Sequence, residues 1–254
     1  ELCNRITIIR HGKSMGVYDV KTVTEQDISN LMVGRDVILN IEKSAPKIGK
    51  TTIRVSDLTI IGENGKHCIN RLSFSLREGE ILGIAGVEGN GQLELVEALT
   101  GLRKYNAGSI EICGKEISQC NVKDIRKLAV SHIPEDRMTT GAAPSLSITE
   151  NMLSDKISSN SFSKHGIINK RAIKQYGIDM VKQYQILCKN PDVSIDSLSG
   201  GNIQKAVLAR ELSNNPKIII ADQPTRGVDV GATEFIHKRL INMRDNKKSV
   251  LLIS

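Results

Sequence analysis

The stretch from Gly86 to Leu93 has the residue types and the spacing of a loop that could hold phosphate. It reads G-V-E-G-N-G-Q-L and lies between an apolar run at 81–85 and a helix-like segment at 92–100. In a strand–loop–helix of this kind, glycines let backbone N–H groups approach the oxygens, and the helix N-terminus favours negative charge. The candidate phosphate-binding residues are Gly86, Val87, Glu88, Gly89, Asn90, Gly91, Gln92 and Leu93.

The side chains of this loop depart from the G-x-x-x-x-G-K-[ST] pattern. Gln92 stands where a lysine would reach the β- and γ-phosphates, and Leu93 stands where a hydroxyl would hold Mg²⁺. Hydrogen bonds to charged groups contribute about 1.5–3 kcal/mol each, so losing the lysine should weaken phosphate binding about ten- to a hundredfold. The sequence therefore predicts a phosphate loop without its cation and without its metal ligand.

A second motif, K-I-I-I-A-D-Q-P from Lys217 to Pro224, has a Walker B pattern, in which a buried strand presents a carboxylate to Mg²⁺. Asp222 is thus the candidate metal ligand, although an Asp at a strand end is also common without function. Gln223 stands where a Glu normally polarises the attacking water. An amide is a very weak base, and the loss of such a base should slow hydrolysis about 10²- to 10⁴-fold.

A third motif, L-S-G-G-N-I-Q-K from Leu198 to Lys205, places Ser199, Gly200 and Gly201 at the start of a predicted helix. Bare glycine N–H groups, a hydroxyl and the helix dipole together make an anion site. An ordinary S-G-G turn before a helix is the alternative. The position about twenty residues ahead of the Walker B strand favours the anion site.

The elements around these motifs predict an α/β fold. Continuous apolar runs at 218–221 and 250–253 each follow a helix-like segment, which is typical of buried parallel strands. In such a sheet the ligand site lies at the carboxyl ends of the strands, where the Gly86 loop begins. Alternation at 51–61 and 71–76, with a strand pair at 108–117, predicts antiparallel strands. From about 138 to 197 we expect a helical insertion, with helices at 149–153 and 169–187.

The N-terminal stretch is expected to form two short strands and a helix before Gly34. A capping box at Thr24 and Asp27 marks the start of that helix. Three elements are too few to bury its apolar face. The domain boundaries we expect are 1–37 as the end of a preceding domain, 38–50 as a linker and 51–254 as a second domain. Because the chain begins with Glu1, we also expect it to be a piece of a longer protein.

The composition limits the classes of partner and function that fit the chain. The chain has 254 residues, and 35 Lys+Arg against 28 Asp+Glu give a net charge of +7. This balance is compatible with nucleic acid, an anionic membrane surface or nucleotide, but also with an ordinary solvated surface. Aromatic residues make up 3%, without Trp, which argues against a base-stacking platform. The five cysteines form no C-x-x-C pair, which indicates reduced thiols. No apolar run is long enough for a membrane span.

The motifs together resemble an ATP-binding cassette (ABC) ATPase. L-S-G-G-N-x-Q-K and I-A-D-Q-P-T-R-G-V-D-V-G-A, from Ile220 to Ala232, are similar to its signature, Walker B and D-loop. More narrowly, G-V-E-G-N-G-Q, I-P-E-D-R and Q-P-T-R-G-V-D resemble the second cassette of tandem-cassette subunits for bacterial sugar and nucleoside uptake. N-R-I-T-I-I-R-H-G-K and L-M-V-G-R, within 1–37, resemble the end of the first cassette. The resemblance covers essentially the whole chain.

The resemblance implies a P-loop NTPase fold with ATP and Mg²⁺ as cofactors. Two such cassettes pair head to tail, so Ser199, Gly200 and Gly201 would contact ATP that the preceding cassette holds. Asp229 in the D-loop would reach the same site. Residues 86–93, with Asp222 and Gln223, would form the chain's own site. Three features depart from the family: Pro134 or Glu135 replaces the Q-loop Gln, the aromatic A-loop residue is absent, and the switch His would lie beyond Ser254.

The function that follows is an importer's ATP-binding subunit on the cytoplasmic face of the cell membrane. It would bind ATP but scarcely hydrolyse it, and its signature would complete the partner site. Its expected partners are the preceding cassette, transmembrane permease subunits that contact the region from Pro134 to Ser197, and, indirectly, an extracytoplasmic substrate-binding protein. No nucleic acid is expected. Two alternatives stay open: a soluble ABC protein acting on ribosomes or nucleic acid, and a structural cassette that binds no nucleotide.

Overall fold

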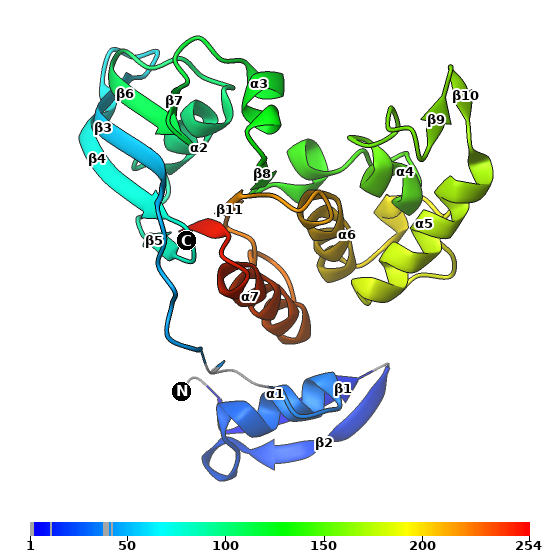
Figure 1. Cartoon of the computed structure of the whole chain (residues 1–254). Coiled ribbons are helices and arrows are strands. Elements are labelled where there is room, and N and C mark those ends of the chain that lie inside the picture. The colour runs from blue at the N-terminus through cyan, green and yellow to red at the C-terminus, as the bar shows by residue number, and fades with distance from the viewer. Residues whose placement is uncertain (1–2, 11, 38–40, 42) are drawn as a thin grey trace.

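The computed structural model describes residues 3–10, 12–37, 41 and 43–254. Its centre is a parallel sheet of order β5-β12-β11-β8, and an antiparallel sheet of order β4-β3-β6-β7 lies beside it. In Figure 1 the antiparallel sheet and the helical insertion lie on opposite sides of the parallel strands. The predicted α/β class, with an antiparallel subdomain and a helical insertion, is confirmed.

The parallel sheet is built from short apolar strands, of which β8, β11 and β12 are almost wholly buried and β5 is partly buried. Its strands are β5 (Ile81–Ile84), β8 (Val130–Ile133), β11 (Ile218–Asp222) and β12 (Ser249–Ile253). The register pairs Ile220 of β11 with Leu251 on one side and His132 on the other. Helix α6 (Gly200–Leu212) leads into β11, and α7 (Val230–Asp245) leads into β12. This alternation makes all the carboxyl strand ends meet at one edge.

The antiparallel sheet packs on the same core through its alternating apolar residues. Its strands are β3 (Thr51–Ile61), β4 (His67–Arg77), β6 (Ala107–Ile112) and β7 (Lys115–Glu116). The alternation in β3 shifts at Asp57, whose φ of 47° accompanies a break in the register with β4. Helix α2 (Gln92–Thr100) contributes Leu95 and Leu99 to this core, and α3 (Val122–Lys127) contributes Ile125.

The insertion contains helices, as predicted, but the long helix is shorter than predicted. It contains a π-helical turn (Arg137–Gly141), α4 (Ile148–Leu153), α5 (Lys170–Gln183) and a 3-10 turn (Ile195–Ser197). Helix α5 ends at Gln183 rather than Leu187, because Gln185 adopts a positive φ of 53° that cannot continue a helix. A small hairpin, β9 (Ser163–Lys164) with β10 (Ile167–Ile168), was not predicted.

The N-terminal segment forms the elements expected of it. Strands β1 (Arg5–Arg10) and β2 (Lys13–Asp19) pair, a 3-10 turn (Val20–Thr22) follows, and α1 (Glu25–Val33) begins at the predicted capping box. In Figure 1 this segment lies below α7. Arg35 forms an ion pair with Glu234 of α7 at 2.8 Å. No helix in the described ranges is both long and apolar enough to cross a membrane.

Candidate functional site

The predicted residues of the chain's own nucleotide site gather where the parallel strands end. The phosphate loop follows β5, Asp222 ends β11, and Pro134 follows β8. The Gln223 N–H donates to the Ile253 carbonyl at 3.0 Å, and the Gly86 N–H donates to the Ser254 carbonyl at 3.4 Å. These bonds bring the loop, the Walker B end and the last strand together, as the topology predicts.

The glycines of the phosphate loop set its course. Gly89 and Gly91 have φ values of 89° and 96°, which other residues rarely adopt. Gly91 is buried, and a Cβ there would overlap the Cys68 carbonyl of β4. The loop therefore lies close against β4, and only glycine fits at this position.

Gln92 folds back into the loop instead of pointing out of it. Its Nε2 donates to the Val87 carbonyl at 3.0 Å, and its Oε1 is buried without a donor in the described part of the chain. A Cβ at Gly86 would overlap this amide. Leu93 is 54% exposed and offers no oxygen. The loop thus supplies backbone N–H groups but neither a cation nor a hydroxyl.

A cavity of about 430 Å³ opens between the phosphate loop and β4. The residues of its lining are contributed by β4, the end of β5, the loop and the start of α2, and the described ones include no aromatic ring. The lining therefore agrees with the sequence, in which the aromatic A-loop residue of the family is absent. Arg71 is the one cationic side chain in this described lining.

Asp222 is buried at the end of β11. Burial raises the pKa of this carboxyl from 3.8 to about 6. Gln223 follows with a positive φ of 44°, so the chain turns sharply away from the strand. The described residues contain no cluster of three His, Cys, Asp or Glu that could hold a metal. A magnesium ion would therefore depend on Asp222, water and the phosphates themselves, which is how Mg²⁺ commonly binds with nucleotides.

The signature residues lie at the start of α6, as predicted. Ser199 is the N-cap residue, yet its hydroxyl accepts no bond from the helix backbone. Instead it accepts from Nδ2 of Asn202 at 2.9 Å. The apolar face expected of this helix (Ile203, Ala206, Val207 and Leu212) is buried. The backbone N–H groups of the first turn therefore remain without a side-chain acceptor among the described residues.

The helices at the two candidate phosphate sites differ from the other helices in how their first turns are capped. Of the seven α-helices in the described ranges, α1, α3, α4, α5 and α7 have a side chain that accepts from the first turn. Helices α2 and α6 have none. Since uncapped N–H groups need another partner, these two ends are the ones prepared for an external anion.

The two helix ends belong to separate cavities. Ser199 and Gly201 line one of about 330 Å³, together with Asp229, and this cavity shares no described lining residue with the loop cavity. A Cβ at Gly201 would lie 2.9 Å from Oδ2 of Asp229. Asp229 also caps α7 by accepting from the Ala232 N–H at 2.9 Å. The signature and Asp229 thus lie together, away from the chain's own phosphate loop.

Arg137 was not among the predicted site residues, although I-P-E-D-R was noted. Its Nη1 donates to the Arg226 carbonyl at 2.8 Å, and Nη2 donates to the Gly227 carbonyl at 3.2 Å. A Cβ at Gly200 would lie 2.7 Å from Nη2. Arg137 therefore connects the start of the insertion, the turn after β11 and the signature. Arg137 lies 89 and 90 positions from its two partners in the sequence, so no local pattern could reveal these contacts.

Arg226 was also not among the predicted site residues, because its contacts likewise join distant parts of the sequence. Its guanidinium forms an ion pair with Glu135 and lies 3.8 Å from the Glu88 carboxylate. It joins the phosphate loop to the turn after β8.

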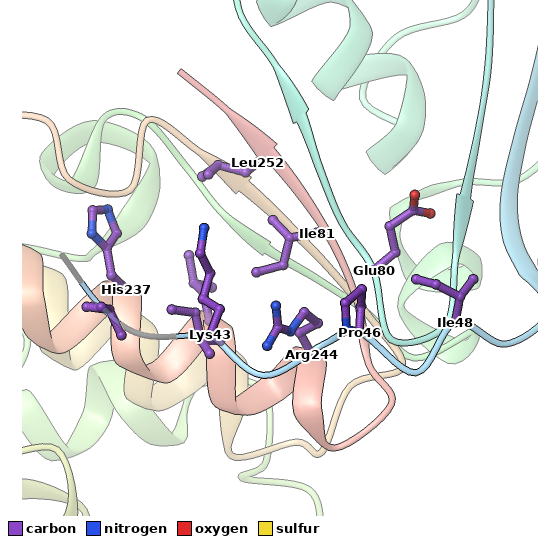
Figure 2. A pocket seen from close by; sticks show the side chains of 11 residues that line it. Lys43, Pro46, Ile48, Glu80, Ile81, His237, Arg244 and Leu252 are labelled. Carbon is purple, nitrogen blue, oxygen red and sulfur yellow. The ribbon is translucent and has the colours of Figure 1, made fainter.

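A larger cavity, of about 630 Å³, lies elsewhere and contains none of the predicted site residues. Figure 2 shows it between the segment at 43–48, α7, the start of β5 and the end of β12. Lys43 extends over it from this segment, and Arg244 donates to the Ser44 carbonyl at 3.1 Å. These contacts attach the segment to α7.

The chain matches known proteins over most of its length. The family model described as "ABC transporter" matches residues 69–226. The chain is 40% identical over 253 residues to a guanosine import ATP-binding protein of Bacillus subtilis, covering 100% of the chain and 50% of that protein. It is 41% identical over 253 residues to a nucleoside import ATP-binding protein of Lactococcus lactis, with the same coverage. The chain thus spans about half the length of these curated relatives.

Solved structures share the fold. A dimeric bacterial ABC transporter cassette, MJ0796, has a TM-score of 0.67 and 23% identity, covering 80% of this chain and 87% of its own. The ADP conformation of the cassette MJ1267 has a TM-score of 0.66 and 19% identity, and the match covers 81% of this chain and 82% of that chain. With the family model matching more than half of the chain and the motif geometry described above, the chain belongs to the ABC transporter family and contains its ATP-binding domain.

Proposed function

We propose that this chain is the second ATP-binding cassette, with the end of the first, of a nucleoside importer's tandem-cassette subunit. Its own phosphate loop binds ATP but hydrolyses it scarcely, while its signature completes the active site of the first cassette. The observation that carries the proposal is the contrast at the two uncapped helices: α2 begins with Gln92 and Leu93, whereas α6 begins with an open Ser199–Gly200–Gly201 turn.

The phosphate loop supports binding without efficient turnover. Its glycines and the uncapped start of α2 supply donors for phosphate oxygens. Gln92 is neutral, and its amide is bonded to the loop itself. Gln223 cannot accept a proton from water, which removes a contribution of about 10²- to 10⁴-fold in rate. Asp222 remains to hold Mg²⁺ once its carboxyl is ionised.

The signature supports a role at a neighbouring site. Ser199, Gly201 and Asp229 line a cavity apart from the chain's own loop. Residues Val33 and Arg35, which we assign to the end of the first cassette, line the same cavity. A triphosphate held by the first cassette would thus meet the N–H groups of α6.

We assign the cargo and the partners from the names of the relatives. The names of two relatives at 40% and 41% identity specify guanosine and nucleoside import, whereas a ribose/galactose-type relative in Rhizobium etli is 34% identical. We therefore assign a nucleoside as cargo, a transmembrane permease and a substrate-binding protein as partners, and the cytoplasmic face of the membrane as the location. The permease contact is assigned to the insertion, residues 134–197.

The test is transport by the full-length subunit with its permease and its substrate-binding protein in proteoliposomes. ATP should drive uptake of labelled guanosine more strongly than uptake of labelled ribose. Uptake of ribose alone would reassign the cargo, and ATP-independent uptake of both would contradict the proposal.

A further inference from the structure

We infer that Arg226 supplies the cation that the phosphate loop lacks at Gln92. The inference rests on the proposed binding of ATP by this loop and names the side chain that completes it. Without nucleotide, Arg226 is held by Glu88 and Glu135; with nucleotide, its guanidinium moves to the terminal phosphates, and the two carboxylates are released.

Arg226 lies between three elements of the chain's own site. Its backbone N–H donates to the Gln223 carbonyl at 3.0 Å, which fixes it beside the Walker B turn. Its side chain pairs with Glu135, directly after β8, and lies 3.8 Å from Glu88 within the phosphate loop. Its carbonyl accepts from Arg137, so the backbone that carries the side chain is held from the other side.

Charge makes such a cation necessary. Glu88 is a carboxylate within the loop, and Glu135 pairs with the same arginine, whereas the lysine position is neutral. The loop itself therefore offers a triphosphate a negative side chain and no positive one. Arg137 is already bonded to two carbonyls, and Arg71 lines the loop cavity from the β4 side. Arg226 is the arginine whose guanidinium already contacts a carboxylate of the loop.

The exchange of partners is favourable in magnitude. The Arg226 side chain is 54% exposed and that of Glu88 is 84% exposed, so their ion pair contributes little to stability. Guanidinium–phosphate hydrogen bonds are charge-assisted and often bidentate, and one such contact strengthens binding about tenfold to a hundredfold. The Glu135 side chain is 30% exposed, so its pair with Arg226 is also open to solvent. Both pairs of Arg226 are thus weak enough to open, and the phosphate contacts are strong enough to replace them.

The inference makes opposite predictions for the two partners of one ion pair. If Arg226 and Glu88 serve only to stabilise the loop, removing either side chain's charge should weaken nucleotide binding. If Arg226 binds phosphate and Glu88 competes for it, Arg226→Gln should weaken binding and Glu88→Gln should strengthen it.

The experiment titrates the 254-residue chain with MgATP, MgADP and AMP by calorimetry. Arg226→Gln should weaken MgATP binding about tenfold or more, Arg226→Lys should restore part of the loss, and AMP binding should not change. Glu88→Gln should tighten MgATP binding about two- to fivefold. Arg171→Gln on α5 is the exposed control and should stay within about twofold of wild type. Arg71→Gln tests the cationic side chain that lines the loop cavity, and it should lose less MgATP affinity than Arg226→Gln.

The outcomes separate this inference from the proposed function. If wild type does not bind MgATP, the proposed function fails. If wild type binds and Arg226→Gln binds equally well, or if Arg71→Gln carries the loss instead, the inference alone fails. Circular dichroism checks the fold of each variant. If Arg226→Gln is unfolded, the direction of the Glu88→Gln effect decides: tighter binding supports the inference, and weaker or unchanged binding overturns it.

Discussion

Helices α2 and α6 share a first turn without a capping side chain and differ in the residues and backbone that lead into it. Both lack a capping side chain, although every other α-helix in the described ranges has one. At α2 the chain arrives through glycines at positive φ and continues with Gln92 folded back onto the loop. At α6 it arrives through Ser199, whose hydroxyl is bonded to Asn202.

The comparison teaches that binding and hydrolysis depend on different parts of an ABC site. Backbone N–H groups that hold phosphate are kept at both helices, because the glycines and the fold supply them. At the chain's own site we propose that Gln92 replaces the cation for phosphate, Leu93 replaces the hydroxyl for Mg²⁺, and Gln223, after β11, replaces the proton acceptor. One helix end is therefore expected to bind, and the other to serve a neighbour's reaction.

The largest expected effect is at α6. In the full-length subunit, Gly200→Asp should lower ATP hydrolysis about 100-fold or more, because it would place a carboxylate beside N–H donors that we expect to face phosphate. Phosphate release measures the rate. Gly200→Ala is the control, since a Cβ there meets only the end of the Arg137 side chain. Full activity in Gly200→Asp would remove the role assigned to the signature.

The next effect concerns the Walker B strand. Since burial raises the Asp222 pKa from 3.8 to about 6, the folded chain retains a proton between these pH values that the unfolded chain releases. Stability should fall as the pH rises through this window and level off above pH 6. Asp222→Asn should remove that fall and be more stable at pH 7 by up to about 3 kcal/mol.

Urea unfolding from pH 4 to pH 8 without Mg²⁺ measures this difference. Asp192→Asn, at an exposed position, is the matched control and should follow the wild-type profile. Equal pH profiles for Asp222→Asn and wild type would show that the carboxyl is not buried in solution.

The third effect concerns the start of α2. Gln92→Lys with Leu93→Ser should tighten MgATP binding about ten- to a hundredfold, because a cation and a hydroxyl return to the loop. Calorimetry of the 254-residue chain measures the change. Gln119→Lys adds the same charge at an exposed turn and should leave the affinity unchanged. No tightening in the double variant would discredit the assignment of the loop.

The smallest effect compares two serines that precede helices. Ser147 accepts from the Glu150 N–H and completes a capping box, so Ser147→Ala should cost about 1 kcal/mol of unfolding free energy. Ser199 caps nothing, so Ser199→Ala should cost much less. Urea denaturation of both variants checks this. Equal losses would mean that Ser199 does cap α6 in solution.

The fold could be predicted because its signals are local. The apolar run at 218–221, the alternation at 53–60 and the capping box at Thr24 each specify an element from neighbouring residues. The glycine loop and the Ser199 turn could be placed at helix starts for the same reason. The end of α5 could not, because Gln185 breaks the helix without glycine or proline to mark it.

The remaining site contacts depend on folding rather than on local sequence. Arg137 and Arg226 meet residues about 90 or more positions away, and their partners are two backbone carbonyls and two carboxylates, which leave no pattern. That Gln92 bonds to the Val87 carbonyl is a rotamer choice within the loop. The raised pKa of Asp222 arises from burial by the whole sheet.

The most direct test of the central claim is turnover of labelled ATP by the purified 254-residue chain under conditions in which it is saturated. The account predicts measurable MgATP binding with hydrolysis at least 100-fold below the ordinary enzymatic range of about 1–10³ s⁻¹. Hydrolysis by the isolated chain within that range would contradict it.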